Sequence, residues 1–318
     1  MTGANINKLN QVKTFTILTL AAAFWGFQPS CIKWLIGVWS PVTLTACRYF
    51  IMSLLLLAWA YRRSGKAFLP RRDAWPWLIA MGIIGILINN VSQFTGLKYT
   101  TITNCTLISA SSPVIAAVMS YLIIRERLSR LSWLGIALSF AGVLVVVSHG
   151  SLDVLRSLSF NRGDILCFVS QVSWTVYSLM GLRVMQKLDP VATTGWAGFL
   201  GAWVTLVYGL ATDDFHPVAL SLKPLVAFWY TILCGGVLAM AGWNLGVKAA
   251  GVSLASIFLN LMPVVGMVAG YGLFQEEIGA AQLGGALAIF CGVFLTTNSD
   301  RIAYWVSGST NSYARHKR

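Results

Sequence analysis

The chain has 318 residues, of which 57% are hydrophobic and 10% are charged, and its mean hydropathy is +0.71. Soluble proteins carry about 25% charged residues, so this composition excludes an ordinary soluble domain and indicates a polytopic membrane protein. The formal net charge of +13 does not indicate a nucleic-acid partner, because the basic residues lie mostly in short breaks between apolar segments.

Ten apolar segments follow a polar N-terminal stretch, residues 1–13, and each is close to the 20 or so residues that a helix needs to cross a bilayer. They cover residues 14–36, 42–61, 75–97, 101–124, 131–148, 164–182, 191–211, 224–247, 252–274 and 281–297. The first segment lacks an obvious small-residue cleavage site, so we interpret it as a membrane span and not as a removed signal peptide. The sequence therefore predicts an all-α integral membrane protein with ten transmembrane helices.

The positions of Lys and Arg predict the orientation of the chain. With a cytoplasmic N-terminus, seventeen of these residues fall in cytoplasmic segments and four fall on the opposite side. Short cytoplasmic loops of membrane proteins carry this excess of positive charge. We therefore expect both termini to be cytoplasmic, in a multi-pass protein of the cell's inner (plasma) membrane.

A long stretch of the sequence occurs twice. Residues 85–145 match residues 235–295 at an offset of 150 without a gap, and the earlier spans match at an offset of 149. The shared residues include Gly96, Lys98, Pro113, Glu126 and Gly142. Because each copy holds five spans, an odd number, the second copy must be inverted in the membrane relative to the first. We expect two repeats, residues 14–148 and 164–297, an external linker, residues 149–163, and a basic cytoplasmic tail, residues 298–318.

Several motifs along the chain resemble those of one transporter family. They are Phe24-Trp25-Gly26, the entry into the second span from Pro41 to Arg48, Gly96-x-Lys98, Pro113, Glu126 and the fifth span from Gly135 to Gly142. In this order, and with their repetition, the chain resembles the EamA-type branch of the drug/metabolite transporter superfamily from about residue 14 to residue 297. The resemblance implies a ten-helix inverted-repeat carrier, often a bacterial exporter of amino acids or other small metabolites. The chain departs from symmetry where Ala197 stands at the position of Arg48, so any role of this arginine is confined to one repeat.

Aromatic and polar residues inside the spans predict a central cavity. Trp25 and Gln28 lie one helical turn apart and share a face of the first span. The equivalent face of the sixth span carries Gln171, Trp174 and Tyr177. Inverted-repeat carriers bind substrate near the midplane, where the repeats meet, so these side chains are candidates for substrate binding. The alternative is that the aromatic residues pack between helices or lie at the membrane interface.

Amides extend this candidate site. The third span carries Asn89, Asn90 and Gln93, the eighth carries Trp243 and Asn244, and the ninth carries Asn260 before Pro263. An unpaired amide costs roughly 2–7 kcal/mol in an apolar environment, so these amides should face protein or a wet cavity. The alternative for each of them is a hydrogen bond between helices.

Five charged residues are candidates for a gate or for coupling. Arg48 lies deepest in the predicted spans, and it can bind a substrate carboxylate or a carbonyl at a helix C-terminus. Lys98 and Lys248 close the third and eighth spans, where the alternative is that they extend to the lipid headgroups, and Glu126 and Glu276 close the fourth and ninth. Because no Asp or Glu lies in the middle of a span, we expect facilitated diffusion or proton coupling through a carboxylate at the end of a span.

The sequence carries no motif for catalysis or for a cofactor. The six cysteines form no CxxC pair and the three histidines lie in loops or the tail, so we expect no metal site. Paired aspartates, HExxH or a GxSxG-like serine, which an intramembrane enzyme would need, are missing. The leading hypothesis is a carrier with a small-molecule substrate and membrane lipid as its partners. A membrane scaffold or receptor that does not transport is the alternative, and the oligomeric state is not predicted.

Overall fold

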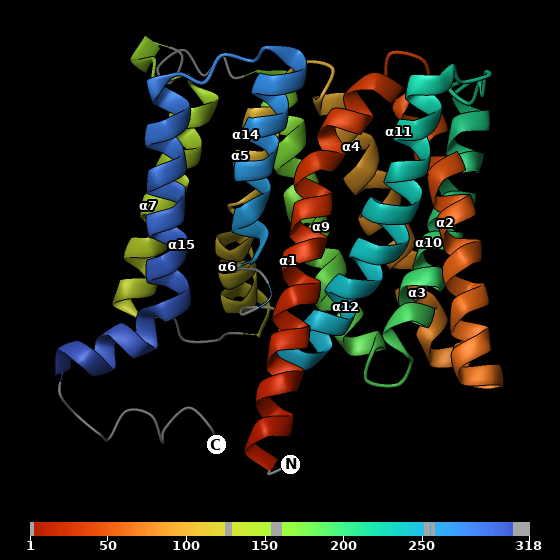
Figure 1. Ribbon diagram of the computed structural model, residues 1–318, viewed down its shortest axis with the longest axis horizontal. Coiled ribbons are helices and arrows are strands. Elements are labelled where there is room, and N and C mark those ends of the chain that lie inside the picture. Colours follow the sequence, from red (N-terminus) through yellow and green to blue (C-terminus); the bar gives the residue numbers. More distant parts are fainter. Residues whose placement is uncertain (1–2, 125–128, 154–160, 251–254, 256–257, 308–318) are drawn as a thin grey trace.

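The computed structural model describes residues 3–124, 129–153, 161–250, 255 and 258–307, and no strand occurs in these ranges. The first half contains α1 (Gly3–Leu35), α2 (Pro41–Ser64), the short η1 (Gly65–Phe68) and η2 (Arg72–Ala74), α3 (Trp75–Met81), η3 (Gly82–Ile88), α4 (Asn89–Gly96), α5 (Ile102–Ser109), α6 (Ser112–Ile124) and α7 (Arg130–Val147). The second half contains α9 (Arg162–Val184), α10 (Pro190–Ala211), α11 (Leu222–Ile232), η4 (Leu233–Leu238), α12 (Ala239–Ala250), η5 (Phe258–Asn260), α14 (Leu261–Phe274) and α15 (Ala280–Ser307). The long helices stand side by side in one bundle (Figure 1).

The lengths and composition of these helices suit a membrane. Seven helical stretches are long and apolar enough to cross one, namely Val12–Leu35, Pro41–Ser64, Arg72–Gly96, Ile102–Met119, Arg162–Val184, Pro190–Ala211 and Leu222–Ala249. Three shorter apolar helices cover Trp133–Val146, Phe258–Phe274 and Ala280–Leu295. Large apolar side chains also point outward, with Leu122 68% and Val268 70% exposed, as lipid contact requires. The predicted all-helical chain is therefore confirmed for the described residues.

Two pairs of equivalent helices, α2 with α10 and α7 with α15, pack together and run in opposite directions. The hydroxyl of Ser40, which caps the start of α2, donates to the carbonyl of Asp214 beyond the end of α10 (Oγ–O 2.8 Å). In the pair formed by α7 and α15, a Cβ on Gly285 would lie 2.9 Å from the Gly142 carbonyl oxygen, and a Cβ on Gly292 would lie 2.5 Å from that of Gly135. Glycine lets these two backbones approach closely. Both contacts show that the halves are inverted relative to each other.

The first helix of each half packs mainly into the opposite half. Helix α1 lies against α11, α12 and α14, whereas α9 lies against α3, α4, α5 and α6 (Figure 1). These two helices contact the opposite half at equivalent positions. Gln28 of α1 covers Gly235 in η4, and Tyr177 of α9 covers Gly85 in η3. A Cβ on either glycine would overlap the covering side chain. The two halves are thus interlocked at two positions, one where α1 crosses η4 and one where α9 crosses η3.

The segments η3 and η4 are π-helical and occupy equivalent positions in the two halves. A π-helix bonds each N–H one residue further back than an α-helix does, is rare, and is frequent at functional sites. The two segments also pack against equivalent helices, but the large residue of the contact lies on the π-helical segment in η3 and on the neighbouring helix in η4. Ile86 of η3 lies against Gly201 of α10, and Gly236 of η4 lies against Met52 of α2. The duplication therefore preserved the backbone geometry while the side chains diverged.

Candidate functional site

A cavity of about 70 Å³ lies between the two halves. It is lined by Trp25, Gln28, Pro29, Arg48, Tyr49, Asn89, Asn90, Gln93, Gln171, Trp174, Met240, Leu259 and Met262. Seven of the residues named from the sequence as cavity candidates are in this lining, and Arg48, named as a gate or coupling residue, joins them. The other five lining residues are Pro29, Tyr49, Met240, Leu259 and Met262. Sequence reasoning missed them because apolar and aromatic residues are common throughout a membrane protein.

Arg48 is the charge that lies deepest in this cavity, with 1% of its surface exposed. Its guanidinium group donates to three uncharged oxygens, namely Thr231 O from Nε (3.0 Å), Gln28 Oε1 from Nη2 (3.0 Å) and Asn90 Oδ1 from Nη1 (3.4 Å). The ring of Tyr49 lies 5.1 Å from Cζ. Within the described ranges, none of the ion pairs involves Arg48. The cation is therefore held by dipoles and by an aromatic ring, without a partner carboxylate in the described chain.

Backbone carbonyls at the π-helical segments hold several cavity side chains in place. Trp25 Nε1 donates to Gly235 O in η4 (2.8 Å), and Asn90 Nδ2 donates to Ile86 O in η3 (3.0 Å). Thr231 O, the acceptor of Arg48, lies two residues before η4. Carbonyls at such irregular turns are open to side chains from other helices, because the regular ladder is interrupted there. The π-helical segments thus supply acceptors to both walls of the cavity.

Three tryptophans meet beside the cavity. The ring centroids of Trp25 and Trp174 are 5.3 Å apart, and those of Trp243 lie 5.6 Å from Trp25 and 6.2 Å from Trp174. Trp174 also stacks on Tyr177, with centroids 5.2 Å apart. Trp25 and Trp174 are equivalent residues of the two halves. Trp25 and Trp174 are in the cavity lining and give it an aromatic wall that suits an aromatic or aliphatic group.

Three of the remaining predicted amides, Asn89, Gln171 and Asn244, form contacts between helices. Asn89 Nδ2 donates to Ser170 O (2.7 Å), and Gln171 Oε1 accepts from Ser112 Oγ (2.8 Å). Asn244 is not in the cavity lining, and its side chain donates to the Thr194 hydroxyl. Asn260 is also outside the lining, and its Oδ1 is buried without a hydrogen-bond partner among the described residues.

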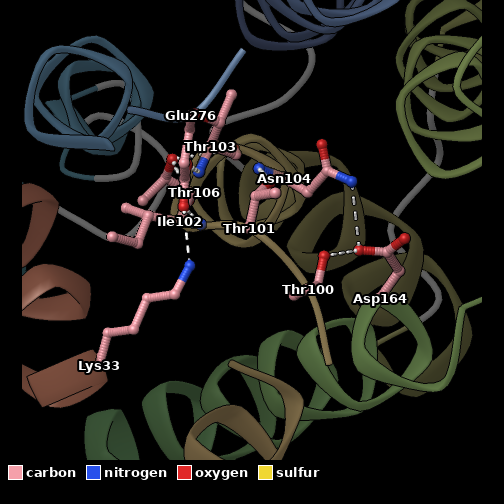
Figure 2. A network of polar contacts seen from close by, with 9 residues as sticks. All are labelled: Lys33, Thr100, Thr101, Ile102, Thr103, Asn104, Thr106, Asp164 and Glu276. Atoms are coloured by element: carbon pink, nitrogen blue, oxygen red, sulfur yellow. Dashed lines mark hydrogen bonds and ion pairs between the residues drawn. The ribbon is translucent and has the colours of Figure 1, made fainter. Parts of the chain in front are cut away.

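Glu276 forms a second polar centre, at the end of the bundle where α1 ends (Figure 2). Its Oε1 accepts from Lys33 Nζ (2.9 Å) and from the Ile102 backbone N–H (2.9 Å), and its Oε2 accepts from the N–H and the hydroxyl of Thr103 (both 3.1 Å). Ile102 and Thr103 begin α5, where unsatisfied N–H groups and the helix dipole attract an anion. Gln275, with a left-handed φ of 53°, turns the chain after α14 so that Glu276 points back onto α5.

The charge state of Glu276 follows from these contacts. Burial by itself would raise the pKa of the carboxyl group, but the hydrogen bonds from Ile102, Lys33 and Thr103 outweigh it and hold the pKa below its ordinary value. The ionised carboxylate connects the second half of the chain to α1 and α5 of the first half. We refer to Lys33, Glu276, Ile102 and Thr103 together as the Glu276 latch.

The other charged candidates lie at helix ends. Lys98 follows α4 and Lys248 lies in the last turn of α12, and both are exposed. Glu126 lies outside the described residues. Near the latch, Asp164 in the first turn of α9 accepts from Thr100 Oγ1 (2.5 Å) and links α9 to the turn before α5 (Figure 2).

A helical bundle of two inverted halves around a shared cavity is the architecture of a secondary transporter. A family model described as the EamA-like transporter family matches residues 13–148 and again residues 161–298. The chain is 30% identical over 299 residues to the uncharacterized transporter YyaM of Bacillus subtilis (strain 168), covering 92% of this chain and 96% of that protein. It is 28% identical over 286 residues to an uncharacterized transporter of Archaeoglobus fulgidus, covering 90% and 97%. The chain therefore belongs to the EamA-like transporter family, as its sequence motifs predicted.

Two further comparisons agree with this membership. The uncharacterized inner membrane transporter YedA of Escherichia coli (strain K12) is 26% identical over 279 residues, covering 86% of this chain and 87% of that protein. A protein of known crystal structure has the same fold, with a TM-score of 0.65 at 18% identity, covering 91% of this chain and 98% of that one. Together with the apolar helices, these likenesses identify a multi-pass integral membrane transporter.

Proposed function

We propose that the protein is a secondary carrier that exports small metabolites such as amino acids, with neutral and aromatic ones favoured. The observation that carries this proposal is the cavity lined by side chains of both inverted halves. Carriers of this architecture expose such a site to one side and then to the other by rocking one half against the other. The aromatic wall and the amides of the lining suit a zwitterion or an aromatic ring better than a multivalent ion.

The proposed topology has ten spans, made of the seven long helical stretches and the three shorter apolar helices. An even number of spans leaves both termini on one side, and the Lys and Arg distribution favours the cytoplasm. One relative, YedA, is named an inner membrane transporter, which supports the same location for this chain.

The size of the cavity supports alternating access. Its volume of about 70 Å³ is far below the roughly 300–1,000 Å³ of sites that hold small molecules, so the walls must separate to admit an amino acid. The Glu276 latch joins the two halves at one end of the bundle through the pair of Lys33 Nζ and Glu276 Oε1, 2.9 Å apart. In the proposed cycle this latch is a gate that breaks when the site opens toward that end.

The test combines binding with flux. Purified protein is screened by thermal unfolding against neutral and aromatic amino acids, and each ligand found is assayed for exchange in proteoliposomes. We expect a ligand that stabilises the protein and exchanges across the vesicle membrane, with both effects lost in Trp25→Ala and Trp174→Ala. Trp133→Ala is the matched control, because Trp133 is 42% exposed on α7 and is not in the cavity lining. A ligand that stabilises all three variants as it does the wild type would place the site elsewhere, and binding without any exchange would indicate a receptor.

A further inference from the structure

Among the described residues, Arg48 is a buried cation that forms no ion pair with a carboxylate. A charge taken out of water is costly unless a partner of opposite charge or a metal compensates it. The described carboxylates that form ion pairs have other partners, since Glu276 pairs with Lys33 and Asp73 pairs with Lys187. The acceptors around Arg48 are two amide oxygens and one backbone carbonyl. Dipoles of this kind position a guanidinium group, but they leave its positive charge uncompensated.

The orientation of the guanidinium group gives its two edges different roles. The Nε edge is anchored to the backbone at Thr231 O, which fixes the plane of the group. The terminal nitrogens, Nη1 and Nη2, each donate to an amide of the cavity lining, and the longer of these bonds, to Asn90 Oδ1, is 3.4 Å. These bonds use three of the five N–H groups of the arginine. A carboxylate can accept from both terminal nitrogens at once, in the bidentate geometry that arginine favours.

The surroundings of Arg48 select a particular kind of carboxylate. Trp25, whose Nε1 donates to Gly235 O in η4, continues into the aromatic wall formed with Trp174. Met240 and Met262 are also in the lining. A molecule with its carboxylate on Arg48 would therefore place its remaining groups against aromatic and thioether side chains, where apolar groups are favoured.

We infer that Arg48 is the docking site for the carboxylate of the transported molecule, so that the substrates are small monocarboxylates with an apolar or aromatic side group, neutral amino acids among them. This inference rests on the proposed transport function. In the absence of substrate, Gln28 Oε1 and Asn90 Oδ1 occupy the positions that the two carboxylate oxygens take. Gln28 and Asn90 are then positioning residues that release the guanidinium group when the substrate arrives.

The first experiment compares ligands that differ only in the carboxylate. Thermal unfolding of the purified protein is measured with L-tryptophan, indole-3-propionate, L-tryptophanamide and tryptamine, and with the corresponding series built on L-leucine. We expect the two carboxylates of each series to stabilise the wild type, and the amide and the amine to need at least tenfold higher concentrations. This preference should disappear in Arg48→Gln and be partly kept in Arg48→Lys. Arg183→Gln, at an arginine stacked on Trp77, is the matched control and should keep the preference.

The second experiment needs no ligand. Gln28→Glu places a carboxylate where the amide oxygen now lies 3.0 Å from Arg48 Nη2. We expect this variant to unfold at a higher temperature than the wild type and to lose its response to carboxylates, because its own carboxylate fills the site. Gln171→Glu adds the same charge to the cavity beside Ser112, without an arginine, and should unfold at a lower temperature. The gain from Gln28→Glu should be absent when Arg48→Gln is also present.

The outcomes separate this inference from the transport function. Equal stabilisation and equal exchange of tryptamine and L-tryptophan by the wild type would refute carboxylate docking while leaving a carrier. A lower unfolding temperature for Gln28→Glu would also refute it, because Arg48 would then have no need of an anion. Failure of every compound to exchange, with Gln28→Glu behaving as expected, would leave an anion-binding site in a protein that does not carry these molecules.

Discussion

Neutralising Glu276 should loosen the contact between the two halves. In Glu276→Gln the side chain keeps its shape and one acceptor oxygen, but it loses the charge that pairs with Lys33, and its amide group is placed against donors. The Glu276 carboxylate is only 5% exposed, so water does not replace the lost contacts. A hydrogen bond to a charged group contributes about 1.5–3 kcal/mol to stability. Because one acceptor oxygen is retained, we expect the free energy of unfolding to fall by about 2–4 kcal/mol. Thermal unfolding of wild type and variant at neutral pH measures the difference.

The dependence of this loss on pH follows from the direction of the pKa shift. The pKa of Glu276 in the folded protein lies below its ordinary value, so the contribution of the carboxylate is fully present above the unfolded-state pKa of about 4.3. It is lost as the pH falls through the lower pKa of the folded state. The difference between wild type and Glu276→Gln should therefore be constant from pH 8 to about pH 5 and shrink at more acidic pH.

Two results would refute this reasoning. One is equal unfolding temperatures of wild type and Glu276→Gln at pH 7, and the other is a difference that persists unchanged below pH 4. Gln275→Gly is the control in the same loop. Gln275 has a left-handed φ of 53°, which glycine adopts more readily, so this variant should be as stable as the wild type or more stable by about 0.5–1 kcal/mol.

Three further substitutions test the packing of the halves, each by thermal unfolding of the purified variant. Gly285→Ala should lower the free energy of unfolding by about 1–3 kcal/mol, because its Cβ would lie 2.9 Å from the Gly142 carbonyl oxygen. Gly284→Ala is the control and should be neutral, because a Cβ there meets open space. Equal effects of the two substitutions would contradict the contact of α7 with α15. Gly85→Ala should lower the free energy of unfolding by a similar amount, because its Cβ would overlap the Tyr177 ring. A neutral result would contradict the packing of α9 against η3. Lys33→Met should lower stability by about 1 kcal/mol, less than Glu276→Gln does, because the Lys33 side chain is 27% exposed, and a larger loss than in Glu276→Gln would contradict the ranking.

Much of the fold follows from the sequence, because the two patterns that indicate it, the apolar segments and the internal repeat, are local or periodic. Apolar runs separated by short polar breaks mark the helices, and the repeated register of Gly96 and Glu126 with Gly246 and Glu276 marks the two halves. The inversion follows from an odd number of spans per half, and the antiparallel contact of Gly142 with Gly285 agrees with it. The family membership followed from the same motifs, since their order along the chain is itself information.

The contacts inside the site could not be predicted in the same way. Lys33 and Glu276 are 243 residues apart, and no local pattern indicates that a lysine at the end of α1 meets a carboxylate after α14. The π-helical segments were also missed, because their apolar composition does not distinguish them from α-helix. The glycines at 85 and 235 gave a partial signal, since each marks a point of close approach. Trp25, Gln28 and Asn90 lie at the cavity, and their part in substrate binding stays a prediction.

The crossing of α1 over η4 and the crossing of α9 over η3 share one backbone geometry but differ in their side chains. This difference bears on the substrate. At η4 the crossing helix brings Gln28, next to Arg48 and its carbonyl acceptor Thr231. At η3 the equivalent positions hold Tyr177, which is 1% exposed, and Ala197. One crossing thus holds a charged group, and the other has a tyrosine and an alanine at the two equivalent positions. A carrier of a symmetric ion would have no use for this division, whereas a molecule with one charged end and one apolar end matches it.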